Sequence, residues 1–245
     1  VVQYGRFLWK VLHGDLGRSL RTNRPVIEDI MERLPSTIEL AIAAMVLAIS
    51  LGVVIGIIAA IYQNTWIDTF STVLALFGVS LPGFWLGLML IFLFALRLGW
   101  FPATGQGGLS RLILPAITLA WYVAAIIARL VRSSMLEVIR MEYVVTARAK
   151  GLKEWVVIYR HALRNALIPV VTIIGLQFGN LLAGTVITET VFARQGLGRL
   201  IIEGILQKDF PVVQGTILFT SMMYVVVNLL VDISYVGIDP RIRYR

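Results

Sequence analysis

Cysteine is absent from this chain, and charged side chains are scarce. The 245 residues include no Cys and two His, and only 15% are Asp, Glu, Lys or Arg. A chain without cysteine has no disulfide framework, no thiolate nucleophile and no Cys-ligated metal site. Soluble domains carry about a quarter charged residues. At 58% hydrophobic residues and a mean hydropathy of +0.83, the composition excludes an ordinary soluble domain and indicates a membrane protein with several spans.

Sequence signatures of nucleotide binding and of catalysis are also missing. No G-x-x-x-x-G-K-[ST] motif is present, so this chain is not expected to hydrolyse ATP. Intramembrane proteolysis would need a Ser–His pair or two apposed aspartates. His13 and His161 lie in polar segments, and Asp232 is, apart from Glu39, the only acidic residue within or beside a span. No filter motif of a channel is visible. We predict no catalytic and no metal-binding residues, and we disfavour an intramembrane enzyme and a passive channel.

Five apolar runs are long enough to cross a bilayer, because a helix needs about 20 residues to span the hydrocarbon core. They follow a mixed, amphipathic segment and cover residues 37–61, 70–96, 112–128, 166–187 and 212–231. The sequence therefore predicts an all-α, polytopic membrane protein with five transmembrane helices in this chain. Residues 1–35 form an amphipathic segment, which the family resemblance described below implies is external, and residues 36–245 form the transmembrane domain.

Local signals predict how these helices begin, pack and bend. Ser36 and Glu39 form an S-x-x-E capping box, which predicts a helix start at residue 36 and gives Glu39 a structural role. Gly52 and Gly56 have the small-xxx-small spacing that lets another helix approach closely. The Pro-Gly pair at 82–83 lies in the middle of the second run and predicts a kink. A kink around a pathway and a passive kink remain open as interpretations.

A polar stretch, residues 140–169, interrupts the apolar pattern between the third and fourth runs. It is too polar to lie in a bilayer. Residues 129–165 carry eight basic and three acidic side chains, and an excess of basic residues is typical of cytoplasmic loops. Two interpretations follow from the pattern: a docking handle for a partner, or a solvated loop that only sets topology.

Helical signals within this stretch are specific. Glu142 precedes Arg148 and Lys150 by roughly two turns, and this order of charges suits the macrodipole of a short helix. Gly151 follows at the place where a left-handed C-terminal residue is favoured. A second helical run is predicted from about Lys153.

The same stretch resembles a known family. TARAKG (146–151) is followed by HALRNA (161–166), and the pair is similar to the cytoplasmic loop of ABC-importer permeases of the dipeptide/oligopeptide family. The general permease loop has Glu-Ala-Ala before the glycine and Ile-x-Leu-Pro after it. Val145-Thr146-Ala147 and residues 161–164 depart from this pattern as peptide-type permeases do. Further motifs extend the resemblance, in order, over the chain: DLGRSL (15–20), LPGFWLG (81–87), LGW-P (98–102), GLGRL (196–200), DFPVVQG (209–215), NLLVD (228–232) and DPRIRYR (239–245).

The resemblance implies a type I ABC-importer permease bundle with six transmembrane helices in the full-length protein. Because the chain begins with Val1 and not Met, we expect the first of these helices to be missing. The implied function is transport of di- and oligopeptides across the bacterial inner membrane by alternating access, with glutathione or a nickel chelate as alternative substrates. The implied partners are a homologous second permease subunit, two ABC ATPase subunits that bind ATP and Mg, and an external substrate-binding protein.

This chain itself is expected to hold no cofactor. Its net charge of +8 is explained by membrane lipid and by orientation signals, so no nucleic acid is expected as a partner. The resemblance places an ATPase-coupling loop at residues 132–165. The expected contact residues are Glu142, Thr146, Ala147, Arg148, Ala149, Lys150, Gly151, Leu152, His161 and Arg164.

Candidate residues for the transport pathway come from the polar side chains within spans. Gln177, Asn180 and Asn228 are such candidates, since polar residues in spans tend to face the bundle interior; a hydrogen bond to a neighbouring helix is the alternative. For Asp232, at the end of the last span, a structural pairing is favoured. We interpret GLGRL (196–200) as a surface or re-entrant loop over the pathway.

Overall fold

The structure is a computed structural model that describes residues 9, 11 and 13–238, without the side chains of residues 183, 184, 232 and 234–238. The described part is helical and contains no strand, only an isolated antiparallel bridge between Arg18 and Pro25. This confirms the all-α prediction. The side chain of Asp232 and the DPRIRYR motif lie outside the described residues.

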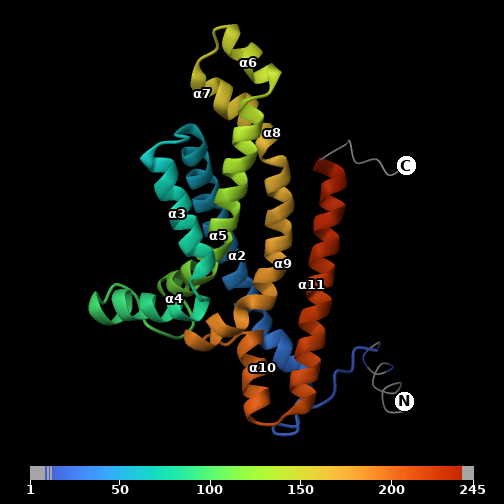
Figure 1. Cartoon of the computed structure of the whole chain (residues 1–245). Coiled ribbons are helices and arrows are strands. Elements are labelled where there is room, and N and C mark those ends of the chain that lie inside the picture. Colours follow the sequence, from blue (N-terminus) through green and yellow to red (C-terminus); the bar gives the residue numbers. More distant parts are fainter. Residues whose placement is uncertain (1–8, 10, 12, 239–245) are drawn as a thin grey trace. The chain divides into compact units, whose positions relative to one another are not determined.

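Most helices follow one another with short connections, and a longer loop, residues 98–108, joins η1 to α5 (Figure 1). Two segments, η1 and η2, are π-helical. The elements are α2 (Val26–Ile61), α3 (Trp66–Ser80), α4 (Gly83–Leu90), η1 (Ile91–Arg97), α5 (Leu109–Ile139), α6 (Glu142–Ala149), α7 (Glu154–Val156), η2 (Val157–Ala162), α8 (Leu163–Ala166), α9 (Ile168–Val191), α10 (Leu197–Leu206) and α11 (Phe210–Ile238).

Three helices, α2, α5 and α11, are each long and apolar enough to cross a membrane within the described residues. The number rises to as many as five if each of two bent pairs is one span. One pair is α3 with α4 and η1, and the other is the α7–α8 stretch with α9. The break between α3 and α4 falls at residues 81–82, so the predicted kink at the Pro-Gly pair is confirmed.

The chain forms two compact units. Unit 1 comprises Val1–Ala43, Gly83–Leu119 and Gly179–Val226. Unit 2 comprises Ala44–Pro82, Ala120–Phe178 and Val227–Arg245. Each unit thus brings together stretches that are far apart in the sequence.

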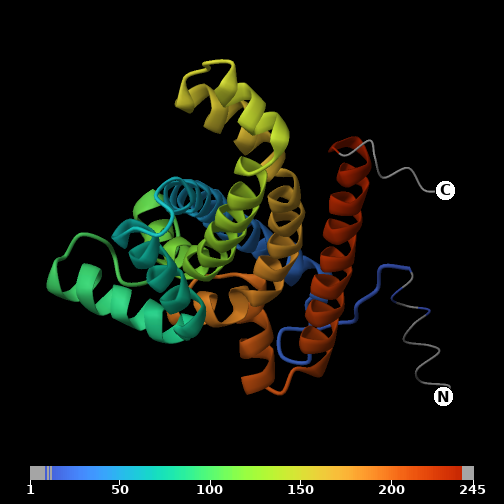
Figure 2. The same cartoon turned by 45° about the horizontal axis from the view of Figure 1, so that its top comes forward.

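In unit 1 the start of α2 packs on α10 and on the start of α11. Val26, Ile30, Leu197, Leu200 and Val212 are buried together and form its apolar core. Figures 1 and 2 show α10 folding back beside the beginning of α11. The two helices approach closely at Gly204, where an added Cβ would lie 2.9 Å from a methyl group of Val213.

The predicted helix start at Ser36 is wrong. α2 begins at Val26, with Glu28 and Asp29 in its first turn, where negative charge is favourable. Pro35 lies inside the helix, and a proline in a helix removes one backbone hydrogen bond and usually kinks the helix. Ser36 and Glu39 are therefore mid-helix residues, and their side chains interact with Arg194.

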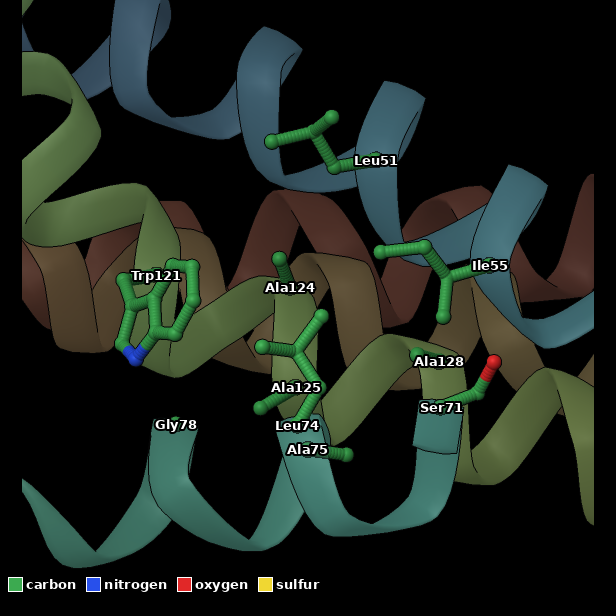
Figure 3. Close-up of a pocket in the computed structure, with 10 residues that line it drawn as sticks. All are labelled: Leu51, Ile55, Ser71, Leu74, Ala75, Gly78, Trp121, Ala124, Ala125 and Ala128. Atoms are coloured by element: carbon green, nitrogen blue, oxygen red, sulfur yellow. The ribbon is translucent and has the colours of Figure 1, made fainter. Parts of the chain in front are cut away.

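In unit 2 α5 packs against α2 and α3 through glycines. A Cβ on Gly56 would lie 2.6 Å from the Cβ of Val131, and a Cβ on Gly52 would lie 2.8 Å from the Ala124 carbonyl oxygen. The predicted close contact at these glycines is thus confirmed. A small cavity of about 40 Å³ remains among α2, α3 and α5, with Trp121 on one side and Gly78 opposite it (Figure 3).

Candidate functional site

The polar stretch 140–169 folds in unit 2 as α6, α7, η2 and α8, which extend from the end of α5 (Figure 1). Met141, at φ −71° and ψ 145°, is extended and separates α5 from α6. Glu142 then lies in the first turn of α6, where the helix dipole favours a carboxylate. The predicted short helix is confirmed, and so is the second helical run, for which Lys153 is the N-cap residue.

The end of α6 is capped by its own backbone. Gly151 adopts the left-handed φ of +76°. The N–H of Leu152 donates to the Ala147 carbonyl at 3.4 Å, and the N–H of Gly151 donates to the Arg148 carbonyl at 2.9 Å. This pair of bonds is the Schellman motif, for which glycine is strongly preferred because a Cβ disfavours the left-handed conformation. The sequence-based expectation for Gly151 is confirmed.

Two side-chain contacts hold α6 against the helices that follow it. The Arg148 guanidinium donates to both carboxylate oxygens of Glu154, with its shortest distance 2.6 Å from Nη2 to Oε1. This bond raises the pKa of Arg148 above its usual range, so the pair stays charged. The Asn165 amide donates to the Tyr143 hydroxyl at 2.7 Å, and the His161 carbonyl accepts from Tyr143 at 3.4 Å. α6 is therefore a fixed element and not a loose loop.

The predicted contact residues lie mostly on the outer side of this element. Val144 and Ala147 are buried beneath α6, so the Ala147 side chain does not reach the outer side. His161 is half-buried. The other predicted residues are exposed: Glu142, Thr146, Arg148, Ala149, Lys150, Gly151, Leu152 and Arg164.

The sequence-based prediction missed large exposed side chains on α6, α7 and η2. Val145 is 54% exposed, Trp155 64% and Tyr159 54%. Exposed apolar clusters of this kind mark interaction sites. The signal was in the sequence, because these residues are apolar within a stretch too polar for the bilayer. We define the coupling surface as the exposed side chains of α6 together with Leu152, Trp155 and Tyr159.

The candidate pathway residues are distributed over both units. Gln177 and Asn228 belong to unit 2, and Asn180 belongs to unit 1. Gln177 is buried. The Asn228 Oδ1 atom is buried without a hydrogen-bond partner among the described residues. Asn180 borders a cavity of about 420 Å³ in unit 1, between α9, α10 and α11, which also has the Tyr224 and Ser221 side chains in its wall.

The GLGRL motif begins the helix α10, whose first turn is largely buried, so its interpretation as a surface or re-entrant loop is wrong. Glu189 is fully buried and caps α10: its Oε2 accepts from the N–H of Gly198 at 2.8 Å and from that of Arg199 at 3.2 Å. The Thr37 hydroxyl donates to Glu189 Oε1 at 2.6 Å and accepts from the Leu197 N–H at 2.9 Å. The orphan N–H groups of the first helical turn are thus satisfied by two side chains from other helices, Glu189 of α9 and Thr37 of α2.

The space around this cap explains why the motif begins with glycine. An added Cβ on Gly196 would collide with the Glu189 carboxylate, so the position needs glycine.

A buried arginine lies next to this cap in unit 1. Arg194 is 1% exposed, and its Nη2 donates to Glu39 at 2.8 Å and to the Ser36 hydroxyl at 3.4 Å. Its Nε has no partner among the described residues. Buried charges need such pairing because desolvation is costly. Sequence reasoning missed this pair, since its members are 155 residues apart.

Two of the family-like motifs meet in unit 1. Asp209, from DFPVVQG, accepts from the Ser19 hydroxyl at 2.5 Å and from the Leu20 N–H at 3.1 Å, and both belong to DLGRSL. A Cβ on Gly17 would lie 3.6 Å from Pro211. Burial raises the pKa of Asp209, but the hydrogen bonds from Ser19 and Leu20 outweigh it, and the net pKa is lowered. The two motifs are therefore held together by the hydrogen bonds of Asp209 with Ser19 and Leu20, and we call this contact the Asp209–Ser19 contact.

Chemical groups for metal binding are not assembled in the described part of the chain, where no cluster of three or more His, Asp or Glu side chains could hold an ion. The candidate site lies on a helical membrane protein. Its notable parts are a capped short helix and exposed apolar side chains.

Residues 52–244 match the family described as "Binding-protein-dependent transport system inner membrane component", and the chain belongs to this family. It is therefore a permease component of an ABC importer. The fold agrees: the MetNI methionine ABC transporter, in an inward-facing crystal structure, matches with a TM-score of 0.73 at 16% identity. That match covers 87% of this chain and 97% of the transporter chain.

Two curated relatives are similar over nearly the whole chain. The "Dipeptide transport system permease protein DppB" of Alkalihalophilus pseudofirmus is 48% identical, over 99% of this chain and 81% of the relative. The "Glutathione transport system permease protein GsiC" of Salmonella paratyphi A is 44% identical, over 100% of this chain and 80% of the relative. The resemblance to peptide and glutathione permeases is thereby confirmed.

Proposed function

We propose that this chain is a permease subunit that moves di- or oligopeptides across the bacterial inner membrane, driven by ATP hydrolysis in separate ATPase subunits. The coupling surface carries this proposal. It combines a rigidly capped helix with exposed Val145, Leu152 and Trp155, as expected of a surface that another protein covers. In this topology the loop 132–165 faces the cytosol, and residues 1–35 lie outside.

Coupling follows from the rigidity of the element. α6 is joined to α7 by the Arg148–Glu154 pair and to α8 by the Tyr143–Asn165 hydrogen bond. A push on α6 is therefore transmitted to the helices that lead into α9. Two ATPase subunits closing on ATP and Mg²⁺ would move this handle and that of a second, homologous permease subunit. The bundle would then change between outward- and inward-facing states.

Substrate choice rests on the relatives. One relative is named for dipeptides and another for glutathione, and glutathione is itself a modified peptide. We propose peptides as the substrate class, delivered by an external binding protein, with glutathione as the alternative.

The test is uptake into proteoliposomes that contain the complete complex and its binding protein. We expect ATP-dependent accumulation of a labelled dipeptide, which an excess of unlabelled dipeptide suppresses more strongly than glutathione does. Omitting this chain should abolish accumulation. Uptake that proceeds equally well without ATP would contradict the proposal and favour a passive channel.

A further inference from the structure

A cavity of about 510 Å³ lies beside α3 and α5 in unit 2, and none of its lining residues belongs to the coupling surface. Its lining combines cationic, hydroxyl and apolar groups. These are Arg129, Arg132, Thr72, Ser133, Ile126 and Leu130. Two guanidinium groups next to hydroxyl donors form the chemistry that binds an oxyanion.

Of the two arginines, Arg132 is paired with a carboxylate and Arg129 is not, among the described residues. Arg132 donates from Nε and Nη2 to the two oxygens of Asp68, at 2.6 and 2.7 Å. The Asp68 carboxylate also accepts the Asn64 N–H at 3.0 Å, and its charge neutralises that of Arg132. Arg129 makes no hydrogen bond or ion pair with any residue that the structure describes. The cavity therefore keeps one unneutralised positive charge.

The depth of the cavity in the membrane follows from its neighbours. Tyr62 and Trp66 are 49% and 76% exposed at the α2–α3 link, and such aromatics gather at the membrane interface. Thr72 lies about 6 Å along α3 beyond Asp68, and Arg129 lies about 4.5 Å along α5 before Arg132, at 1.5 Å per residue. Both lie one turn deeper than the ion pair. At this depth a long cationic side chain reaches the headgroup phosphates.

Exposed apolar side chains lie deeper than the cavity on both helices. Val73 and Phe77, beyond Thr72 on α3, are 43% and 56% exposed, and Tyr122, before Arg129 on α5, is 48% exposed. A free phosphate ion would make no favourable contact with these apolar side chains, whereas the acyl chains of a lipid would bury them.

We propose that this cavity binds the phosphate of an anionic phospholipid in the leaflet next to the coupling surface. Arg129 is the principal cation, Ser133 is an auxiliary donor, and the acyl chains lie along α3. Basic pockets between transmembrane helices on the cytoplasmic side bind anionic headgroups in this way. The Asp68–Arg132 pair has a positioning role, because it fixes α3 against α5 and so shapes the cavity.

The test compares two lipids with the same acyl chains, phosphatidylglycerol and phosphatidylcholine, titrated into the detergent-purified complex while its thermal unfolding midpoint is recorded. We expect phosphatidylglycerol alone to raise the midpoint. Arg129→Gln should weaken its apparent affinity about fivefold, the effect expected for one cation near a membrane surface. Arg140→Gln, which removes another exposed arginine directly after the end of α5, should leave the affinity unchanged.

Further arms identify the source of the anion. Glycerol phosphate without acyl chains should not raise the midpoint; an equal rise would overturn the lipid assignment. An unchanged phosphatidylglycerol effect in Arg129→Gln would also overturn it. So would a raised KM for peptide uptake in Arg129→Gln combined with an intact lipid effect, because the anion would then be a substrate carboxylate.

Discussion

Two short helices in this molecule are held in opposite ways. α6, in unit 2, is capped by its own backbone at Gly151 and fixed by an ion pair whose side chains are 38% and 57% exposed. α10, in unit 1, is capped by Glu189 and Thr37, which come from two other helices and are both fully buried. The first arrangement leaves an apolar outer side uncovered, and the second leaves nothing of its cap exposed. The difference separates a helix whose apolar side chains remain exposed from a helix whose N-terminus is part of a core.

The largest expected effect concerns the buried cap. Glu189→Ala removes the acceptor of three donors, from Thr37, Gly198 and Arg199, and should lower the free energy of unfolding by about 3 kcal/mol, because buried donors would be left unpaired. Glu154→Ala, at the exposed pair beside α6, should cost less than about 1 kcal/mol. Thermal unfolding of the two variants measures both losses of stability. Equal losses would contradict the expected difference between the buried cap and the exposed ion pair.

The next effect concerns binding at the coupling surface. Trp155→Ala should weaken the affinity for the ATPase subunit by roughly thirtyfold, because an exposed tryptophan that becomes buried in an interface is a frequent hot spot. Trp66→Ala removes a tryptophan that is even more exposed but lies at the α2–α3 link, and should leave the affinity unchanged. Titration of the purified ATPase against both variants measures the two dissociation constants. A loss shared by both would show that Trp155 has no special role.

A smaller effect is expected from the backbone of α6. Gly151→Val forces a β-branched residue into the left-handed region, which costs about 1–2 kcal/mol. We expect peptide uptake per ATP hydrolysed to fall roughly tenfold, the equivalent of about 1.4 kcal/mol, while the protein still inserts.

Gly108 provides the matched control for this substitution. Its φ is +75°, against +76° at Gly151, and in both places an added Cβ meets nothing within 4 Å. Gly108→Val therefore introduces similar backbone strain away from the coupling surface and should leave the ratio of uptake to hydrolysis intact. The same loss in both variants would mean that strain alone, and not the position, causes the uncoupling.

The smallest effect is a pH dependence of the stability that the Asp209–Ser19 contact in unit 1 contributes. The pKa of Asp209 is lowered in the folded protein, so its contribution to stability is complete above the unfolded pKa of about 3.9. That contribution is lost as the pH falls through the folded pKa. The stability difference between the wild type and Asp209→Asn should therefore be constant from pH 7 to about pH 5 and shrink below about pH 4. Unfolding midpoints measured across this range test the sign, and a difference that grows on acidification would contradict it.

Sequence reasoning succeeded where the signal was local. The break at the Pro-Gly pair 82–83, the helix from Glu142 and the left-handed Gly151 follow from the conformations of single residues. It failed where the partner was distant. Ser36 and Glu39 have the spacing of a capping box, but the fold uses them as partners of Arg194, and the helix start lies at Val26. No local rule could have assigned Glu189 as the cap of GLGRL, because the folded bundle creates that contact.

The coupling surface itself shows both outcomes. Its helix and most of its exposed residues could be predicted, yet Ala147 lies on the buried side, and Trp155 was not selected. The helical period separates the two sides only once the direction of packing is known.

The central claim is that α6 is gripped by an ATPase subunit in the cytosol. Because the chain has no cysteine, Thr146→Cys introduces a single thiol on the exposed face of α6. We predict that it forms a cross-link of short span to the ATPase in the assembled complex, and that Thr65→Cys, at the α2–α3 link, does not. A Thr146→Cys thiol that reacts with a membrane-impermeant reagent from the outside of intact cells, and forms no cross-link, would contradict the account.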